Sequence, residues 1–217
     1  MVELFGREFS RSEVREYFGS LKSVAGIEKI KYDQGRAKNM SAVEVRTGTG
    51  FRFLVLPDRG LDIGLCEYKG IPISFKSPVA KTAPQYFEHD GDNWLRSFAG
   101  GLLVTCGLNY LGSPNTDQGE DLGLHGRISN VPAYEVGTDT IWKGNDCILQ
   151  IKGKLRETKF LNYNLLLERK IWCKVGENKI HLEDRVINEG FKTSPHMILY
   201  HINIGYPILD SGTKLKI

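Results

Sequence analysis

The spacing of apolar residues changes character once along the chain, near residue 27. Before it, apolar side chains recur at helical spacing at Val14, Tyr17, Phe18 and Leu21. Ser10 and Glu13 have the spacing of a capping box, so we predict a helix that continues to about Gly26 and packs as a lid. After residue 27, short segments rich in Val, Ile, Phe and Tyr are separated by Gly, Asp, Asn and Pro, which is typical of an all-β protein.

The β-rich part begins with a predicted hairpin. Its strands are residues 42–46 and 51–56, joined by a Thr-Gly-Thr-Gly turn. Residues 63–68 and 71–75 flank a second turn, Lys-Gly. Because such hairpins present one apolar face, they need an opposing sheet.

A less regular segment, residues 76–99, precedes a predicted buried strand. Its prolines, glycine and charges predict a long loop, and a long loop inside a compact domain is often functional. Residues 102–106 form a continuous apolar run bounded by glycines, as expected for a strand buried on both faces. Further strands are predicted at residues 134–136, 147–151, 164–172, 179–187 and 198–203.

Together these elements predict an all-β fold, a large twisted antiparallel β-sandwich with a short N-terminal helix. The composition, 41% hydrophobic and 25% charged, suits a core of that size. No tandem repeat, low-complexity tract or linker divides the chain, so residues 1–217 are expected to form a single domain.

Charge and cysteine usage narrow the function classes. The 29 Lys and Arg residues are mixed with 26 Asp and Glu, without a basic run that could follow a phosphate backbone, so nucleic acid is not expected as a partner. The four cysteines occur singly in apolar stretches, which predicts buried free thiols. The start lacks a signal segment, and no run has the length of a membrane span, so we expect a cytoplasmic protein with no membrane partner.

The first candidate site is the pentapeptide Gly123-Leu124-His125-Gly126-Arg127. Its glycines allow a sharp turn or a close approach of backbone to ligand, while His125 and Arg127 supply a titratable imidazole and a planar fork of donors. That combination suits a polar ligand rich in oxygen. The alternative is a tight turn whose histidine is simply solvated.

The second candidate site lies in residues 195–207. Strand alternation places Leu199, His201 and Asn203 on one face, so a proton donor and an amide lie close together. On a groove, this pair suits recognition and protonation of a sugar oxygen. The alternative is a hydrogen-bonded core histidine at the end of a strand.

These residues resemble motifs of the aldose 1-epimerases, also called galactose mutarotases. Leu124-His125-Gly126 is similar to that family's Leu-His-Gly motif. Residues 186–190 resemble its Val-x-Asn strand, and residues 200–203 its later histidine-containing strand. A longer resemblance, spanning nearly the whole chain, is to an uncharacterised bacterial branch of the superfamily without a settled substrate. It is carried by residues 56–63, 98–103, 105–108 and 123–127.

The resemblance implies a β-supersandwich that binds a small-molecule sugar in a groove on one sheet. It implies that His201 is the acid that protonates the ring oxygen, and that His125 is the second, substrate-binding histidine. A reference pKa of about 6.5 suits an acid that works near neutral pH. Arg96 and Arg127 are candidates to hold sugar hydroxyls. Arg59 is a further candidate ligand, with a purely structural ion pair as its alternative role.

The resemblance also implies a catalytic glutamate well beyond the second histidine strand, yet no glutamate follows His201 in this sequence. Either the domain is truncated at its C-terminus, or another carboxylate serves. Glu120, Asp62 and Asp210 are the candidates, by proximity to the motifs alone. A truncated domain would expose strand edges and favour self-association, so a homo-oligomer is a further expectation.

Three function classes therefore stay open: an aldose 1-epimerase-like isomerase, a catalytically silent carbohydrate-binding protein, and a structural sandwich without a ligand. No nucleotide-binding glycine loop or metal-ligand cluster is visible, so we expect neither a cofactor nor an essential metal. Geometry separates the classes, because two histidines facing one groove favour the first two, and an opposed carboxylate favours the first.

Overall fold

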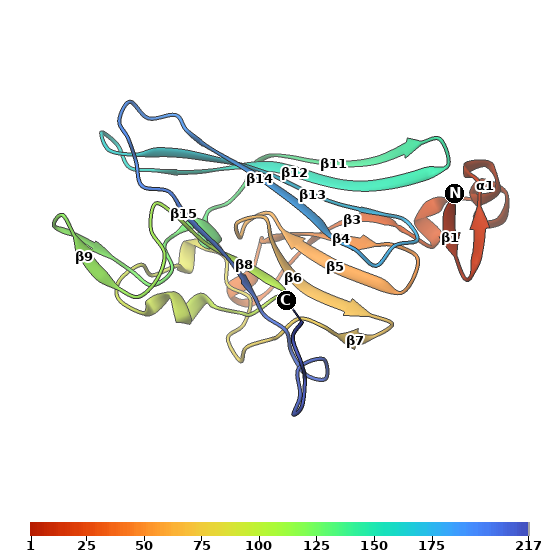
Figure 1. Cartoon of the computed structure of the whole chain (residues 1–217), viewed down its shortest axis with the longest axis horizontal. Coiled ribbons are helices and arrows are strands. Elements are labelled where there is room, and N and C mark those ends of the chain that lie inside the picture. The colour runs from red at the N-terminus through yellow and green to blue at the C-terminus, as the bar shows by residue number, and fades with distance from the viewer. Residues whose placement is uncertain (217) are drawn as a thin grey trace.

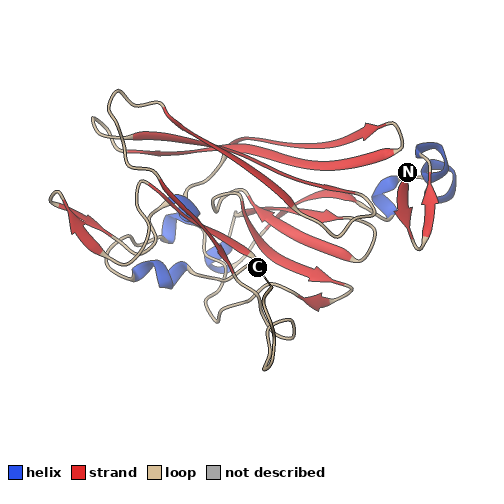
Figure 2. Cartoon of the chain, viewed as in Figure 1, coloured by secondary structure: helices blue, strands red, loops and turns tan. Residues whose placement is uncertain are grey.

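The protein is a sandwich of two antiparallel sheets, seen here in a computed structural model that describes residues 1–216 (Figure 1). Strands dominate it, and the helical segments lie mostly at the ends of the sandwich (Figure 2). The predicted all-β sandwich with one short N-terminal helix is therefore confirmed.

The larger sheet has seven strands in the order β15-β8-β6-β5-β4-β3, with β7 paired to β6. Its strands are β3 (Gly26–Lys31), β4 (Ser41–Arg46), β5 (Phe51–Leu56), β6 (Asp62–Tyr68), β7 (Ile71–Pro72), β8 (Leu103–Leu108) and β15 (Met197–Ile202). All six residues of β8 are buried, as the apolar run predicted. In contrast, β15 forms one edge of the sheet.

The second sheet has four strands in chain order, joined by hairpins. They are β11 (Tyr134–Lys143), β12 (Asp146–Thr158), β13 (Asn164–Lys174) and β14 (His181–Asn188). It covers one face of the larger sheet (Figure 1). Two small hairpins complete the strands: β1 (Val2–Leu4) with β2 (Arg7–Phe9), and β9 (Asn115–Asp117) with β10 (Glu120–Leu122).

The N-terminal helix α1 is shorter than predicted, since it spans Arg11–Phe18 and stops at Gly19. Both hydrogen bonds of the predicted capping box are present at Ser10 and Glu13. Gly19 adopts a φ of 68°, and its N–H bonds back to Arg15 O, which ends the helix. A separate 3-10 turn follows. Apolar residues therefore continue at helical spacing beyond the point where the helix ends. The 3-10 segments are η1 (Leu21–Ser23), η2 (Gly35–Ala37), η3 (Pro84–Tyr86), η4 (Asn93–Ser97) and η5 (Ile128–Asn130).

The core lies between the two sheets. Side chains such as Phe53 and Val55 of the larger sheet belong to the same buried cluster as Leu149 and Leu167 of the smaller one. Burying a side chain of this size contributes about 1.5–3 kcal/mol. The four cysteines are free and completely buried, as predicted: Cys66, Cys106, Cys147 and Cys173.

A charged network crosses this apolar interior. Arg169 of β13 is fully buried, and its guanidinium bonds Asp62 of β6 at 2.9 Å and Asp184 of β14 at 2.7 Å. The hydroxyl of Tyr200 on β15 donates to the same Asp184 at 2.9 Å. The network therefore ties the edge strand β15 to the opposite sheet.

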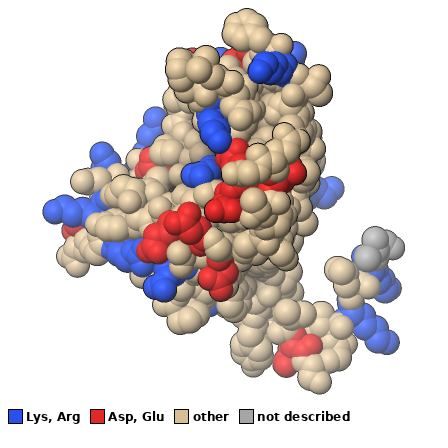
Figure 3. Space-filling model, turned by 90° about the vertical axis from the view of Figure 1, so that its left-hand side faces the viewer, with Lys and Arg blue, Asp and Glu red and all other residues tan. Residues whose placement is uncertain are grey.

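Two further observations concern membrane-spanning helices and the distribution of surface charge. Among residues 1–216, no helix is long and apolar enough to cross a bilayer. On the face drawn in Figure 3, basic and acidic side chains are intermixed, and acidic ones gather near its middle.

Candidate functional site

The two histidines singled out in the sequence lie side by side in the structure. The ring centroids of His125 and His201 are 5.8 Å apart, with an edge-to-face angle of 76°. His125 comes from the turn that follows β10, and His201 comes from β15. Two motifs separated by 76 positions thus meet at one place, as the resemblance implied.

The backbone of His125 has an unusual conformation, which hydrogen bonds to neighbouring segments hold in place. His125 has a φ of 60°, in the left-handed region that side chains rarely adopt. Its N–H donates to Gly112 O at 2.9 Å, and its carbonyl accepts from Gly107 N at 3.1 Å. A Cβ on Gly123 would lie 1.7 Å from His89 O, so only glycine fits there.

Two aromatic side chains of the loop 76–99 flank the histidines. Trp94 lies 4.9 Å from the His125 ring and Phe98 lies 5.9 Å from the His201 ring, measured between centroids. The two aromatics stack on each other at 4.9 Å, and Trp94 Nε1 donates to Ser129 Oγ at 3.1 Å. Trp94 in η4 and Phe98 directly after it are thereby fixed against the site, and they place two apolar rings beside the two imidazoles.

Each of the two imidazoles has a ring nitrogen that residues 1–216 leave without a hydrogen bond. Among the described residues, the Nδ1 atoms of His125 and His201 are both buried without a hydrogen-bond partner. Burial, and secondly the neighbouring His201, lower the pKa of His125 below its ordinary value. His125 is therefore uncharged at neutral pH, and a neutral imidazole has one nitrogen to donate and one to accept.

The predicted arginine ligands differ in their surroundings. Arg96 lies on η4, two residues from Trp94, and is exposed, with its Nε donating to Asn93 Oδ1 at 2.9 Å. Arg127 is exposed two residues beyond His125. Asn203 is buried and its amide donates to His201 O at 3.0 Å, so it supports the strand end next to the ring.

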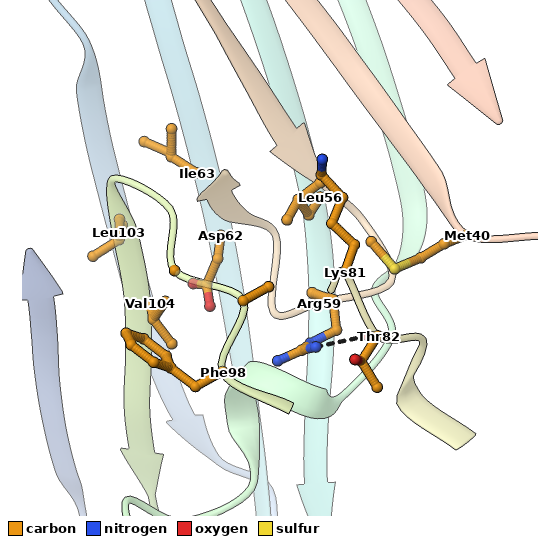
Figure 4. A pocket seen from close by; sticks show the side chains of 12 residues that line it. Met40, Leu56, Arg59, Asp62, Ile63, Lys81, Thr82, Phe98, Leu103 and Val104 are labelled. Carbon is orange, nitrogen blue, oxygen red and sulfur yellow. Dashed lines mark hydrogen bonds between the residues drawn. The ribbon is translucent and has the colours of Figure 1, made fainter. Parts of the chain in front are cut away.

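Arg59 occupies an interior position. Its guanidinium donates to the carbonyl oxygens of Thr82 at 2.7 Å, Ser129 at 2.8 Å and Ser97 at 3.2 Å. It lines a cavity of about 30 Å³ together with Phe98 and Lys81, drawn in Figure 4. Burial lowers the pKa of Arg59 to about 10. These hydrogen bonds hold three backbone carbonyls from separate segments together. Arg59 therefore has structural contacts, but they are not the ion pair that was its alternative role.

The candidate bases are all engaged elsewhere. Asp62 is bound by Arg169 and by the Thr105 hydroxyl at 2.6 Å. Glu120 pairs with Lys159 at 2.8 Å, and Asp210 accepts a hydrogen bond from the Ser211 N–H. Among residues 1–216, no group of three or more His, Cys, Asp or Glu side chains is arranged to hold a metal ion.

The sequence pattern does not mark the aromatic residues Trp94 and Phe98 beside the histidines, nor the burial of Glu157 behind the neighbouring residues Leu108 and Asn109. The aromatics sit in an irregular loop, where no periodicity marks which side chains point inward. Glu157 was detectable only by continuing the inward-facing alternation of β12 from Leu149 and Ile151. The apolar run predicts a strand only to residue 151, whereas β12 continues to Thr158.

Comparisons with known proteins agree on the fold. A family model described as “Domain of unknown function (DUF4432)” matches residues 37–217. The chain is similar to a “putative aldose 1-epimerase” from Klebsiella pneumoniae subsp. pneumoniae MGH 78578, with a TM-score of 0.79 and 26% identity, over 85% of this chain and 48% of that one.

A second solved structure has a similar fold at lower identity. It is a galactose mutarotase-like protein from Clostridium acetobutylicum, with a TM-score of 0.51 and 14% identity over 86% of this chain and 56% of that one. The chain therefore spans about half the length of these solved structures. No protein of curated function matches the sequence.

Proposed function

We propose a function on the premise that the chain belongs to the family described as “Domain of unknown function (DUF4432)” and has a galactose mutarotase-like fold. In this proposal the chain binds an aldose at the His125–His201 pair and serves the interconversion of its anomers. The carrying observation is the meeting of the two imidazoles at 5.8 Å, with their Nδ1 atoms unpartnered. The ligand class is supported by this chemistry, since imidazole nitrogens that can donate or accept a hydrogen bond, beside the aromatic rings of Trp94 and Phe98, suit an uncharged polyol with apolar C–H faces.

The proposed reaction needs one proton donor and one acceptor. In the ring-opening step, His201 gives a proton to the ring oxygen while a base takes the proton of the anomeric hydroxyl, and the bond between the anomeric carbon and the ring oxygen breaks. The open aldehyde rotates, and the reverse proton transfers close the ring with the other configuration. His125 holds the sugar, while the Trp94 and Phe98 rings limit the space beside it.

A second candidate function is sugar binding without catalysis. It is favoured by one observation: the candidate bases Asp62, Glu120 and Asp210 are each engaged by other residues of the protein. Binding requires donors and acceptors only, whereas ring opening also requires the base. The two functions therefore share a site and differ in one group.

Anomer exchange measured by NMR across a panel of aldoses, with calorimetric titration of the same sugars, tests both functions. Exchange faster than in buffer, together with saturable binding, supports the epimerase function. Binding with the uncatalysed exchange rate supports the second candidate. If no aldose in the panel binds, both are contradicted.

Removing a sugar-binding donor should weaken affinity without unfolding the chain. We expect Arg127→Ala and His125→Asn each to raise the dissociation constant, because an unpaired sugar hydroxyl costs about 1–3 kcal/mol, or roughly 5- to 150-fold. Asparagine is chosen because it tolerates the positive φ at position 125. Calorimetry measures the change.

The matched control is Arg185→Ala, since Arg185 is an exposed arginine of β14 whose partner is Glu168. Its affinity for the sugar should equal that of the unaltered chain. Equal affinities for all three variants would contradict the assignment of Arg127 and His125 as sugar ligands.

A further inference from the structure

We propose that Glu157 is a positioning residue for His125, acting through the backbone segment 107–112 rather than by contact with the ligand. Its significance for sugar binding rests on the proposed function, whereas its effect on the His125 ring is a property of the free protein.

Glu157 is a buried carboxylate at the end of β12, only 5% exposed. Its Oε2 accepts the N–H of Leu108 at 2.9 Å, and its Oε1 accepts the N–H of Asn109 at 3.1 Å. Burial raises the pKa of Glu157, and these two N–H groups oppose that shift. Arg127 is the nearby cation, but the two side chains form no ion pair. The carboxylate is therefore committed to two successive amides of one segment.

Segment 107–112 is hydrogen-bonded to the backbone of His125 at both of its ends. At its start, Gly107 N donates to His125 O at 3.1 Å, and Gly107 O accepts from Arg127 N at 3.1 Å. At its end, Gly112 O accepts from His125 N at 2.9 Å. Glu157 holds the residues between these two contacts. The left-handed conformation of His125 thus depends on a segment that is fixed from the opposite sheet.

A glutamine at position 157 has nearly the same shape but opposite chemistry at one atom. Its amide nitrogen would face a backbone N–H, so one of the two hydrogen bonds becomes a repulsion between donors. A buried N–H that loses its acceptor is costly, and the segment shifts to regain a partner. The His125 ring then moves relative to His201.

The test is an NMR titration of the histidine rings without sugar, followed by calorimetry with the aldose that the panel identifies. In Glu157→Gln we expect the titration midpoint of His125 to change and the sugar affinity to fall about tenfold. The ring resonances of His181, which stacks on Trp172 in the four-stranded sheet, should keep their positions. The matched control is Glu168→Gln, an exposed-side glutamate of β13 paired with Arg185. It should leave His125 unchanged.

A merely structural carboxylate would lower the melting temperature and leave the His125 midpoint unchanged, so that result in a folded Glu157→Gln overturns the proposal. If the glutamine variant fails to fold, Glu157→Asp gives the decision. Aspartate keeps the charge but is too short to hold both amides, so it should shift the His125 midpoint, and an unshifted midpoint overturns the proposal. A shifted midpoint in a chain that binds no aldose supports the role of Glu157 and contradicts the proposed function.

Discussion

Replacing Arg169 by alanine is expected to lower the free energy of unfolding by about 3–5 kcal/mol. The guanidinium is fully buried, and it is the cation shared by two buried carboxylates, Asp62 and Asp184. Its removal leaves Asp184 away from water without a counter-charge, and leaves Asp62 with the charge of Arg59 but without its ion pair. Since a domain of this kind is stable by only about 5–15 kcal/mol, the loss is a large part of the total. Chemical denaturation followed by tryptophan fluorescence measures it.

The controls separate lost charge pairing from lost side-chain volume. Arg185→Ala removes an exposed arginine of the same sheet and should cost less than about 1 kcal/mol. Adding Asp184→Asn to Arg169→Ala should restore part of the lost stability, because one uncompensated charge disappears. A loss in Arg169→Ala no larger than that in Arg185→Ala would show that the buried network contributes nothing.

The second large effect is expected on catalysis. With an aldose that the unaltered chain interconverts, His201→Gln should slow anomer exchange by about 10²- to 10⁴-fold, the range typical of a positioned acid or base. Glutamine can still donate a hydrogen bond, so the sugar affinity should fall much less than the rate. Exchange NMR at saturating sugar gives the rate, and calorimetry gives the affinity.

His196→Gln is the matched control, because His196 is an exposed histidine five positions before His201. Its exchange rate should be that of the unaltered chain. An unchanged rate in a folded His201→Gln variant would remove His201 from the role of acid, and it would leave the binding function standing.

Local patterns predicted most strands of the two large sheets, but not β3 or the two small hairpins, and the predicted strand 71–75 is only Ile71–Pro72. The hairpin of β4 and β5 followed from alternation around a glycine-rich turn, and the burial of β8 followed from its unbroken apolar run. The proximity of His125 and His201 was predictable only from the resemblance of their motifs to those of a known family. Periodicity within either segment says nothing about a contact between positions 76 residues apart.

Local patterns could not predict the direction of side chains in loops or the burial of charged side chains in strands. Trp94 and Phe98 reach the histidines through a 3-10 turn in an irregular loop, so tertiary contacts decide their direction. Arg169 and Glu157 both occupy inward-facing positions of alternating strands. Charged residues at such positions are easily taken for solvent-facing ones, because their burial is favourable only when partners from other strands are present.

The buried cysteines give each sheet its own chemical reporter of opening. Cys66 and Cys106 lie in the seven-stranded sheet, and Cys147 and Cys173 lie in the smaller one. Burial raises the pKa of Cys66 and Cys106 to about 12 and that of Cys147 to about 11, so the native thiols are neutral as well as covered. Alkylation needs an accessible thiolate. The order in which the four sulfurs become labelled during mild denaturation therefore records which layer of the protein separates first.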